Sequence, residues 1–167
     1  HEAEQRFYND ITNEDNFYAT FNELKQWAND PLRYQIIRDR KGKEIKLVPY
    51  KNLGTDNKFD PIELYAYYLG LYINNMNNGI YLNYVLSFPV NYGKEVQDRL
   101  LSSFTKGLKK SLPSSILSND EVMEDFEVYA GASEPVAYAI TALEKYSLEP
   151  SNDDEVAYGV FDFGGGT

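Results

Sequence analysis

The sequence predicts an α/β fold, because strand-like and helix-like segments alternate through its second half. A strand of the buried type covers residues 81–88, and a shorter strand covers residues 126–130. An Ala-rich helix follows from residue 134 to about residue 146, and a last strand runs over residues 156–163. With a helix between the first two strands, the order is strand, helix, strand, helix, strand. This order favours a layered α/β architecture over separate α and β domains.

The helix between the first two strands is marked by apolar residues at steps of four positions. This spacing places them on one helix face, and they are Val96, Leu100, Phe104 and Leu108. A polar, acidic connection over residues 113–125 leads to the next strand. Residues 149–155 form a second acidic connection, which we expect to be a flexible loop.

An outer α+β subdomain is predicted before residue 80. A hairpin pairs residues 34–39 with residues 44–48, around a turn at residues 40–43. Residues 51–58 then form a loop. Nearer the N-terminus, one helix is predicted by Phe17, Phe21, Leu24 and Ala28, which share a face, and Pro31 ends it.

The clearest helix of the sequence begins after Asp60. Asp60 is expected to cap it, Pro61 suits its first position, and Glu63 would reach back to complete a capping box. Gly79 is expected to end it. The predicted apolar face consists of Leu64, Tyr65, Tyr68, Leu69, Tyr72, Ile73 and Met76.

These segments divide the chain into four units. Residues 1–30 are an N-terminal helical segment with no firm assignment, and residues 31–79 are the outer subdomain. Residues 80–148 form the core part of the α/β unit, and residues 149–167 hold the acidic loop and the last strand. The chain starts at His1 without Met and ends within a glycine-rich run, so we expect a piece of a longer protein.

Composition limits the classes of partner. The 16 basic and 26 acidic residues give a net charge of −10, which would repel nucleic acid. No apolar run reaches the roughly 18 residues that a membrane span requires. There are no cysteines, which fits a reducing compartment, and we expect a cytoplasmic protein. ATP stays possible, because backbone amides and a metal ion bind phosphate inside acidic proteins.

The C-terminal run has the composition of a phosphate-binding loop. An apolar strand leads to Asp162, and Gly164, Gly165, Gly166 and Thr167 follow. Glycines let backbone N–H groups surround a phosphate, Thr167 would add a hydroxyl donor, and Asp162 would hold a metal-bound water or orient the attacking one. A glycine-rich hairpin turn after an edge strand is the alternative. A kinase-type metal-binding tripeptide would need an upstream His-Arg-Asp loop, but the only histidine is His1.

Two other motifs also lie where strands end. Glu134 stands at a strand-to-helix junction, which is where ligands of α/β proteins collect. The structural alternative is that Ser133 caps the helix, Glu134 favours its dipole and Pro135 starts it. Pro89 closes the strand over residues 81–88, and by itself it is a simple strand terminator.

Together, the three motifs resemble the ATPase domain of the seventy-kilodalton heat-shock chaperones, in the actin and sugar-kinase superfamily. That family has a strand with a proline, a helix, a strand with Glu-Pro, an Ala-rich helix, an acidic linker and then Asp-(Leu/Phe)-Gly-Gly-Gly-Thr. Here the corresponding segments are residues 84–89, 132–139 and 158–167, and the firm match covers residues 81–167. The resemblance implies part of a ribonuclease-H-like, actin-like ATPase fold, with residues 31–148 in lobe I and the phosphate loop in lobe II.

The resemblance also implies roles for individual residues. Glu134 and Asp162 match catalytic carboxylates near the attacking water, and Asp162 would contact the metal ion through water. Gly164, Gly165, Gly166 and Thr167 match the loop that holds the phosphates. Pro89 and Arg99 match an allosteric relay from the nucleotide to the outer surface. The cofactor of the longer parent protein, of which this chain is expected to be a piece, would be ATP or ADP with Mg. The partners of that parent would be client or co-chaperone proteins.

The sequence also departs from the family. Val90-Asn91-Tyr92 is shifted by one residue from the usual pattern, Arg99 lies about two residues late, and Ser133 replaces the usual Asn. The first glycine-bearing hairpin, of Asp-x-Gly-Thr type, does not occur in this sequence. We therefore expect no bound nucleotide and no ATP turnover by this chain alone. We also expect self-association through unpaired sheet edges, or an edge covered by residues 1–30.

Two other functions stay open on the sequence. In one of them, the longer parent protein is an actin-like filament protein or a sugar kinase, although the Glu-Pro junction favours the chaperones. A non-catalytic binding module with the same fold is the third possibility.

Overall fold

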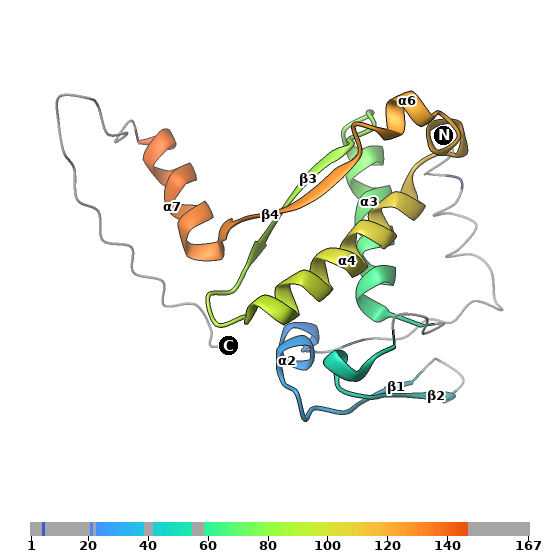
Figure 1. The fold of residues 1–167 in the computed structure, drawn as a ribbon, viewed down its shortest axis with the longest axis vertical. Coiled ribbons are helices and arrows are strands. Elements are labelled where there is room, and N and C mark those ends of the chain that lie inside the picture. The colour runs from blue at the N-terminus through green and yellow to red at the C-terminus, as the bar shows by residue number, and fades with distance from the viewer. Residues whose placement is uncertain (1–4, 6–20, 22, 39–41, 55–58, 147–167) are drawn as a thin grey trace.

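The computed structural model describes residues 5, 21, 23–38, 42–54 and 59–146. These residues form a mixed α/β fold with two small sheets (Figure 1). Its elements are α2 (Leu24–Asn29), β1 (Gln35–Arg38), β2 (Glu44–Leu47), the 3-10 helix η1 (Tyr50–Asn52), α3 (Pro61–Met76), β3 (Asn83–Phe88), α4 (Lys94–Ser111), α5 (Ser114–Leu117), α6 (Asp120–Met123), β4 (Glu127–Ser133) and α7 (Glu134–Lys145).

The larger structural motif is the parallel pair β3–β4, and α4 lies in the connection between its strands. Asn83 pairs with Glu127 at one end of the pair, and Phe88 pairs with Ser133 at the other. Parallel strands need a crossover connection, usually a helix, and α4 provides it. The predicted order of strand, helix, strand and helix is therefore confirmed over the described residues. The last predicted strand, residues 156–163, lies outside them.

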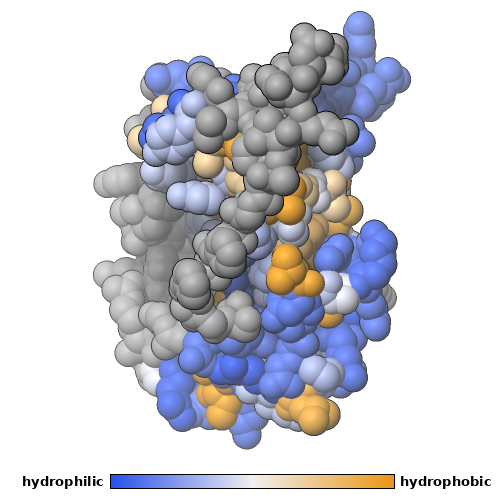
Figure 2. Space-filling model, turned by 90° about the vertical axis from the view of Figure 1, so that its left-hand side faces the viewer, coloured by the Kyte–Doolittle hydropathy of each residue, from blue (hydrophilic) through white to orange (hydrophobic). Residues whose placement is uncertain are grey.

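One face of the β3–β4 pair is packed and the opposite face is open. Tyr84 and Phe88 lie on the same face of β3, because side chains an even number of positions apart point to the same side of a strand. Both are buried against residues of α3 and α4. On the other face, Val85 is 56% exposed and Tyr129, its neighbour on β4, is 42% exposed. On the side of the molecule drawn in Figure 2, apolar side chains reach the surface in an interrupted band between hydrophilic areas.

The predicted hairpin is confirmed as β1–β2, an antiparallel pair in which Gln35 faces Leu47. Ile37 and Leu47 are buried, and Ile45 packs against the same cluster. That cluster unites α2, the hairpin, η1, the start of α3 and the region around β3 and α4. Its buried members are Trp27, Ala28, Ile37, Leu47, Tyr50, Leu53, Ile62, Phe88, Tyr92 and Leu100.

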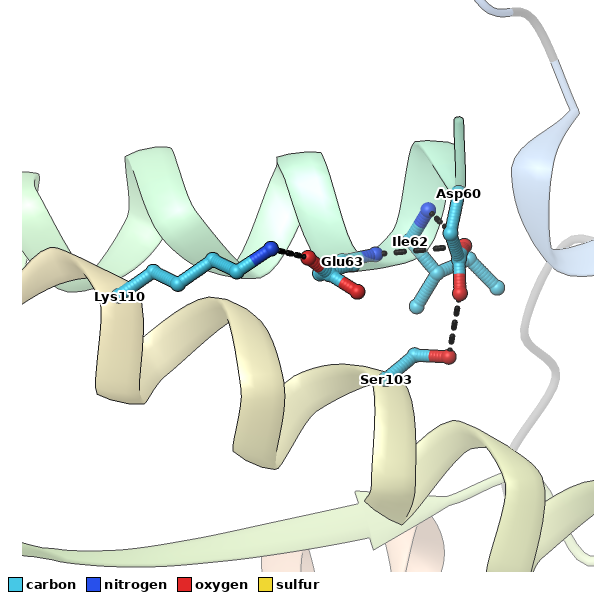
Figure 3. Close-up of polar contacts among 5 residues, drawn as sticks. All are labelled: Asp60, Ile62, Glu63, Ser103 and Lys110. Carbon is cyan, nitrogen blue, oxygen red and sulfur yellow. Dashed lines mark hydrogen bonds and ion pairs between the residues drawn. The ribbon is translucent and has the colours of Figure 1, made fainter. Parts of the chain in front are cut away.

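The predicted start of α3 is confirmed, but its predicted capping box is wrong. The Asp60 side chain accepts from the backbone N–H groups of Ile62 and Glu63. Glu63 does not reach back to Asp60, because its carboxylate pairs with Lys110 of α4 (Figure 3).

The predicted end of α3 is off by a residue. Asn78, rather than Gly79, takes the left-handed conformation, with φ of 51°. The N–H of Asn78 donates to the Asn75 carbonyl, and the N–H of Gly79 donates to the Asn74 carbonyl. These two bonds make a Schellman motif, in which Asn is an accepted substitute for Gly.

The predicted apolar face of α3 is wrong for four of its seven residues, whereas Tyr68, Leu69 and Ile73 are half-buried. Tyr65, Tyr72 and Met76 are each more than half exposed, and Leu64 is 39% exposed. The buried side combines small residues with two large apolar ones, and its members are Pro61, Ile62, Ala66, Gly70, Leu71 and Asn74.

The buried side of α3 is set by its close contact with α4. A Cβ added at Gly107 would meet the Glu63 carbonyl oxygen and would lie 2.7 Å from the Ala66 Cβ. A Cβ added at Gly70 would lie 2.9 Å from the Ser111 Cβ. Small residues at these positions let the two helices approach closely.

The remaining predictions before α7 need small changes. The connection over residues 113–125 contains α5 and α6, each four residues long. The loop predicted from residue 51 begins within η1. The helix at the N-terminus is described from Leu24 to Asn29, and Phe17 of its predicted face lies outside the described residues.

Candidate functional site

The carboxyl ends of β3 and β4 bring two of the predicted site residues to the same edge of the sheet. Phe88 is paired with Ser133, so the residues that follow them, Pro89 and Glu134, leave the sheet at neighbouring positions. Pro89 is buried, and its carbonyl accepts from the N–H of Tyr92 at 3.1 Å. Glu134 is the first residue of α7.

The Glu134 carboxylate is held by a lysine from α2. The Lys25 Nζ atom lies 2.8 Å from Glu134 Oε1, and the two side chains are 60% and 41% exposed. Ser133 occupies the N-cap position of α7, but its side chain makes no capping hydrogen bond. The structural alternative for Ser133 is therefore wrong in this respect, and the main polar partner of Glu134 is Lys25.

Tyr92 joins the same edge from the connection between β3 and α4. Its side chain is 6% exposed, and its hydroxyl donates to the Lys25 carbonyl oxygen at 2.8 Å. Burial raises the pKa of Tyr92 to about 12, and the negative charge of Glu134 acts in the same direction. Lys25, Tyr92 and Glu134 thus form one contiguous polar group.

Arg99 lies elsewhere, on α4. Its guanidinium stands over the Tyr50 ring, 5.0 Å from the centroid, and donates to the Lys51 carbonyl oxygen at 3.0 Å. These contacts hold η1 against α4. The structure therefore does not bring Arg99 into contact with Pro89 or Glu134 through any described hydrogen bond or ion pair, and the predicted relay between Pro89 and Arg99 has no direct contact to support it.

A buried hydrogen-bond chain continues from Tyr50 to the start of α3. Ser103 Oγ donates to Asp60 Oδ2 at 2.6 Å, as Figure 3 shows, and lies 2.8 Å from the Tyr50 hydroxyl. A serine hydroxyl carries one proton and a carboxylate carries none, so the Tyr50 hydroxyl donates to Ser103. Burial raises the pKa of Tyr50, which keeps the hydroxyl protonated for this role.

The remaining predicted site residues lie outside the described part of the chain. They are Asp162, Gly164, Gly165, Gly166 and Thr167. Within the described part, no three Asp, Glu, His or Cys side chains come together as metal ligands. Glu134 is a single carboxylate, and it is paired with the Lys25 ammonium group. The described residues around Glu134 therefore do not by themselves fit a magnesium ion.

Sequence reasoning missed Lys25 and the Tyr50–Ser103–Asp60 chain. Lys25 and Glu134 are 109 positions apart, and no local pattern reports such a contact. The local sequence predicts Asp60 as a helix cap, but its second oxygen accepts from Ser103, a residue 43 positions away. Only the packing of α3 against α4 brings Asp60 and Ser103 together.

No protein-family model, curated protein or solved structure matches the chain. Each helix within the described ranges is also too short or too polar to cross a membrane.

Proposed function

We propose that the chain is part of the nucleotide-binding domain of a heat-shock-seventy-like ATPase, with an actin-like fold. In the longer parent, the loop from Gly164 to Thr167 would bind the phosphates of Mg-ATP. Asp162 and Glu134 would lie beside the attacking water. Hydrolysis would switch the conformation of the parent.

The observation that carries this proposal is the placement of Pro89 and Glu134. They follow two paired parallel strands, and the chain between those strands contains one long helix. Open α/β sheets bind ligands outside the carboxyl ends of their strands. The run from Asp162 to Thr167 follows in the sequence, in the order that the resemblance requires.

The proposal concerns the parent, because ATP hydrolysis needs phosphate, water and metal fixed together. The present sequence carries one glycine-rich phosphate loop. The superfamily uses two, one from each lobe. The chain by itself is expected to bind nucleotide weakly or not at all.

The test is ATP binding and hydrolysis by the full-length parent. We expect Glu134→Gln to leave ATP binding within a few-fold while lowering kcat by about 10²-fold or more, as for a group that acts on the reacting water. Asp162→Ala is expected to lower kcat similarly. Glu144→Gln, at the other end of α7, is the matched control and should retain full activity. A parent that does not bind ATP, or that hydrolyses it at the unmodified rate in the Glu134 and Asp162 variants, would show the proposal to be wrong.

A second candidate is a non-catalytic binding module with the same fold. The Lys25–Glu134 pair favours it, because a carboxylate neutralised by a lysine is not free to orient water. The two candidates differ in the parent sequence. An Asp-x-Gly-Thr loop upstream would favour the ATPase, and its absence together with no ATP binding would favour the binding module.

A further inference from the structure

The ion pair between Lys25 and Glu134 connects two helices that are far apart in the sequence. Lys25 belongs to α2 and Glu134 begins α7, and 109 positions separate them. Figure 1 shows α2 beside the hairpin, whereas α7 stands near the opposite end of the β3–β4 pair from α6. A contact of this kind relates the position of one unit to that of the other.

The α2 side of the contact is firmly anchored. Trp27, two residues after Lys25, is completely buried, and its Nε1–H donates to the Val48 carbonyl oxygen at 3.1 Å. The backbone of Lys25 itself is fixed, because its carbonyl accepts from the buried Tyr92 hydroxyl. The ammonium group therefore extends from a base that does not move easily.

The α7 side is held much more weakly. None of the twelve residues of α7 is buried, whereas α4 has five buried residues. Val136 and Ile140, on the apolar side of α7, are 49% and 56% exposed. A helix with so little buried surface gains little stability from packing, so each polar contact at its first turn matters more to its position.

We propose that Lys25 and Glu134 form an electrostatic latch, which fastens the first turn of α7 to α2 and opens when salt screens the pair. Both side chains are more than 40% exposed, so water and ions reach them easily. Such a pair contributes little to stability, which suits a contact that opens and closes. The latch follows from these contacts alone and does not depend on nucleotide binding.

The test measures hydrogen exchange of the α7 backbone amides in the whole chain. NMR monitors the exchange rates at low and at high salt. Lys25→Gln is the decisive variant, because it does not alter α7. At low salt it should speed exchange in the first half of α7 by about two- to five-fold, the range expected for an exposed ion pair. At about 1 M salt, where screening is nearly complete, it should match the unmodified chain.

A double-mutant cycle separates the latch from the helix dipole. Glu134→Gln also removes a favourable charge from the first turn of α7, so it should speed exchange somewhat more than Lys25→Gln. In the double variant, the increase in the exchange rate should be smaller than the product of the two single increases, because the second change removes no further contact. Lys94→Gln breaks a similarly exposed pair with Asp98 on α4, and it should leave α7 unchanged.

Two results would overturn the latch. One is that Lys25→Gln leaves α7 exchange at the rate of the unmodified chain at low salt. The other is that the effects of Lys25→Gln and Glu134→Gln multiply in full, which would mean that the two residues act independently.

Discussion

Asp60 illustrates how one side chain serves two elements. One carboxylate oxygen accepts from the first N–H groups of α3, and the other accepts from Ser103 of α4. Tyr50 extends the chain to η1. Buried polar groups stabilise a fold when every member has a partner, and in this chain of three side chains each hydroxyl and carboxylate does.

Removing Ser103 is expected to cost more stability than removing the Tyr50 hydroxyl. Ser103→Ala leaves both the Tyr50 hydroxyl and one Asp60 oxygen without their partner, so the free energy of unfolding should fall by about 1–3 kcal/mol. Tyr50→Phe leaves the Ser103–Asp60 bond in place and should cost about 0.5–1.5 kcal/mol. Urea unfolding measures both values.

Ser118→Ala is the control for this comparison, because the Ser118 hydroxyl makes a long, exposed bond at 3.4 Å. It should change stability by less than about 0.5 kcal/mol. If Tyr50→Phe proves as costly as Ser103→Ala, the hydrogen-bond chain does not run from Tyr50 through Ser103 to Asp60.

At the scale of elements, helices α3 and α4 show what a pattern of apolar residues misses. The start of α3 was predicted correctly from Asp60 and Pro61, because capping is a local property of the sequence. The buried face of α3 was not, because counting large apolar residues ignores the small ones. Ala66, Gly70 and Gly107 allow the two backbones to approach, and this approach decides which side is buried.

Alanine at Gly107 is expected to be more harmful than alanine at Gly70. At Gly107 the new methyl group would meet the Glu63 carbonyl oxygen and lie 2.8 Å from the Tyr67 backbone nitrogen, and backbone atoms cannot easily move aside. At Gly70 the obstacle is the Ser111 side chain. Overpacking lowers the free energy of unfolding by about 1–3 kcal/mol, and the higher helix propensity of alanine offsets up to about 1 kcal/mol of this loss.

Thermal or urea unfolding of the two variants tests this order. Gly54→Ala is the control, since an added Cβ there meets nothing within 4 Å. A Gly107 variant as stable as the Gly54 variant would contradict the close contact between the helices.

The candidate site was predictable only in part, and for a physical reason. Glu134 and Pro89 were placed at strand ends from turn and helix-start signals, which are local, and the structure puts them there. The partner of Glu134 was not foreseen, because Lys25 reaches it only through the tertiary fold. Arg99 is assigned to the relay by resemblance alone, and its described contacts are with Lys51 and Tyr50 of η1.

At the scale of the whole molecule, the chain leaves a substantial apolar surface open. Val85 and Tyr129 are exposed on one face of a parallel sheet, although parallel sheets are normally covered on both faces. Val136 and Ile140 of the neighbouring helix α7 are exposed as well. Exposed apolar surface of this kind promotes association.

We expect the isolated chain to self-associate at micromolar concentrations through the open sheet face. Val85→Lys, which places a charge in the middle of that face, should shift the population toward monomer, as sedimentation velocity would show. Leu32→Lys is the matched control, since Leu32 is 80% exposed in a turn and should not affect association. A chain that is monomeric at every concentration, or that responds equally to both variants, would show this expectation to be wrong.

The parallel pairing of β3 and β4 also affects how the protein is made. Asn83 pairs with Glu127, so 127 − 83 = 44 residues must be added before the partner of β3 begins to appear. At a synthesis rate of ~5–20 residues per second, β3 waits roughly 2–9 s for β4. During that interval α4 is completed, and it can already pack against α3. The nascent chain therefore exposes a solitary β-strand beside a helical pair, and an unpaired strand of this kind is a surface that a chaperone can bind.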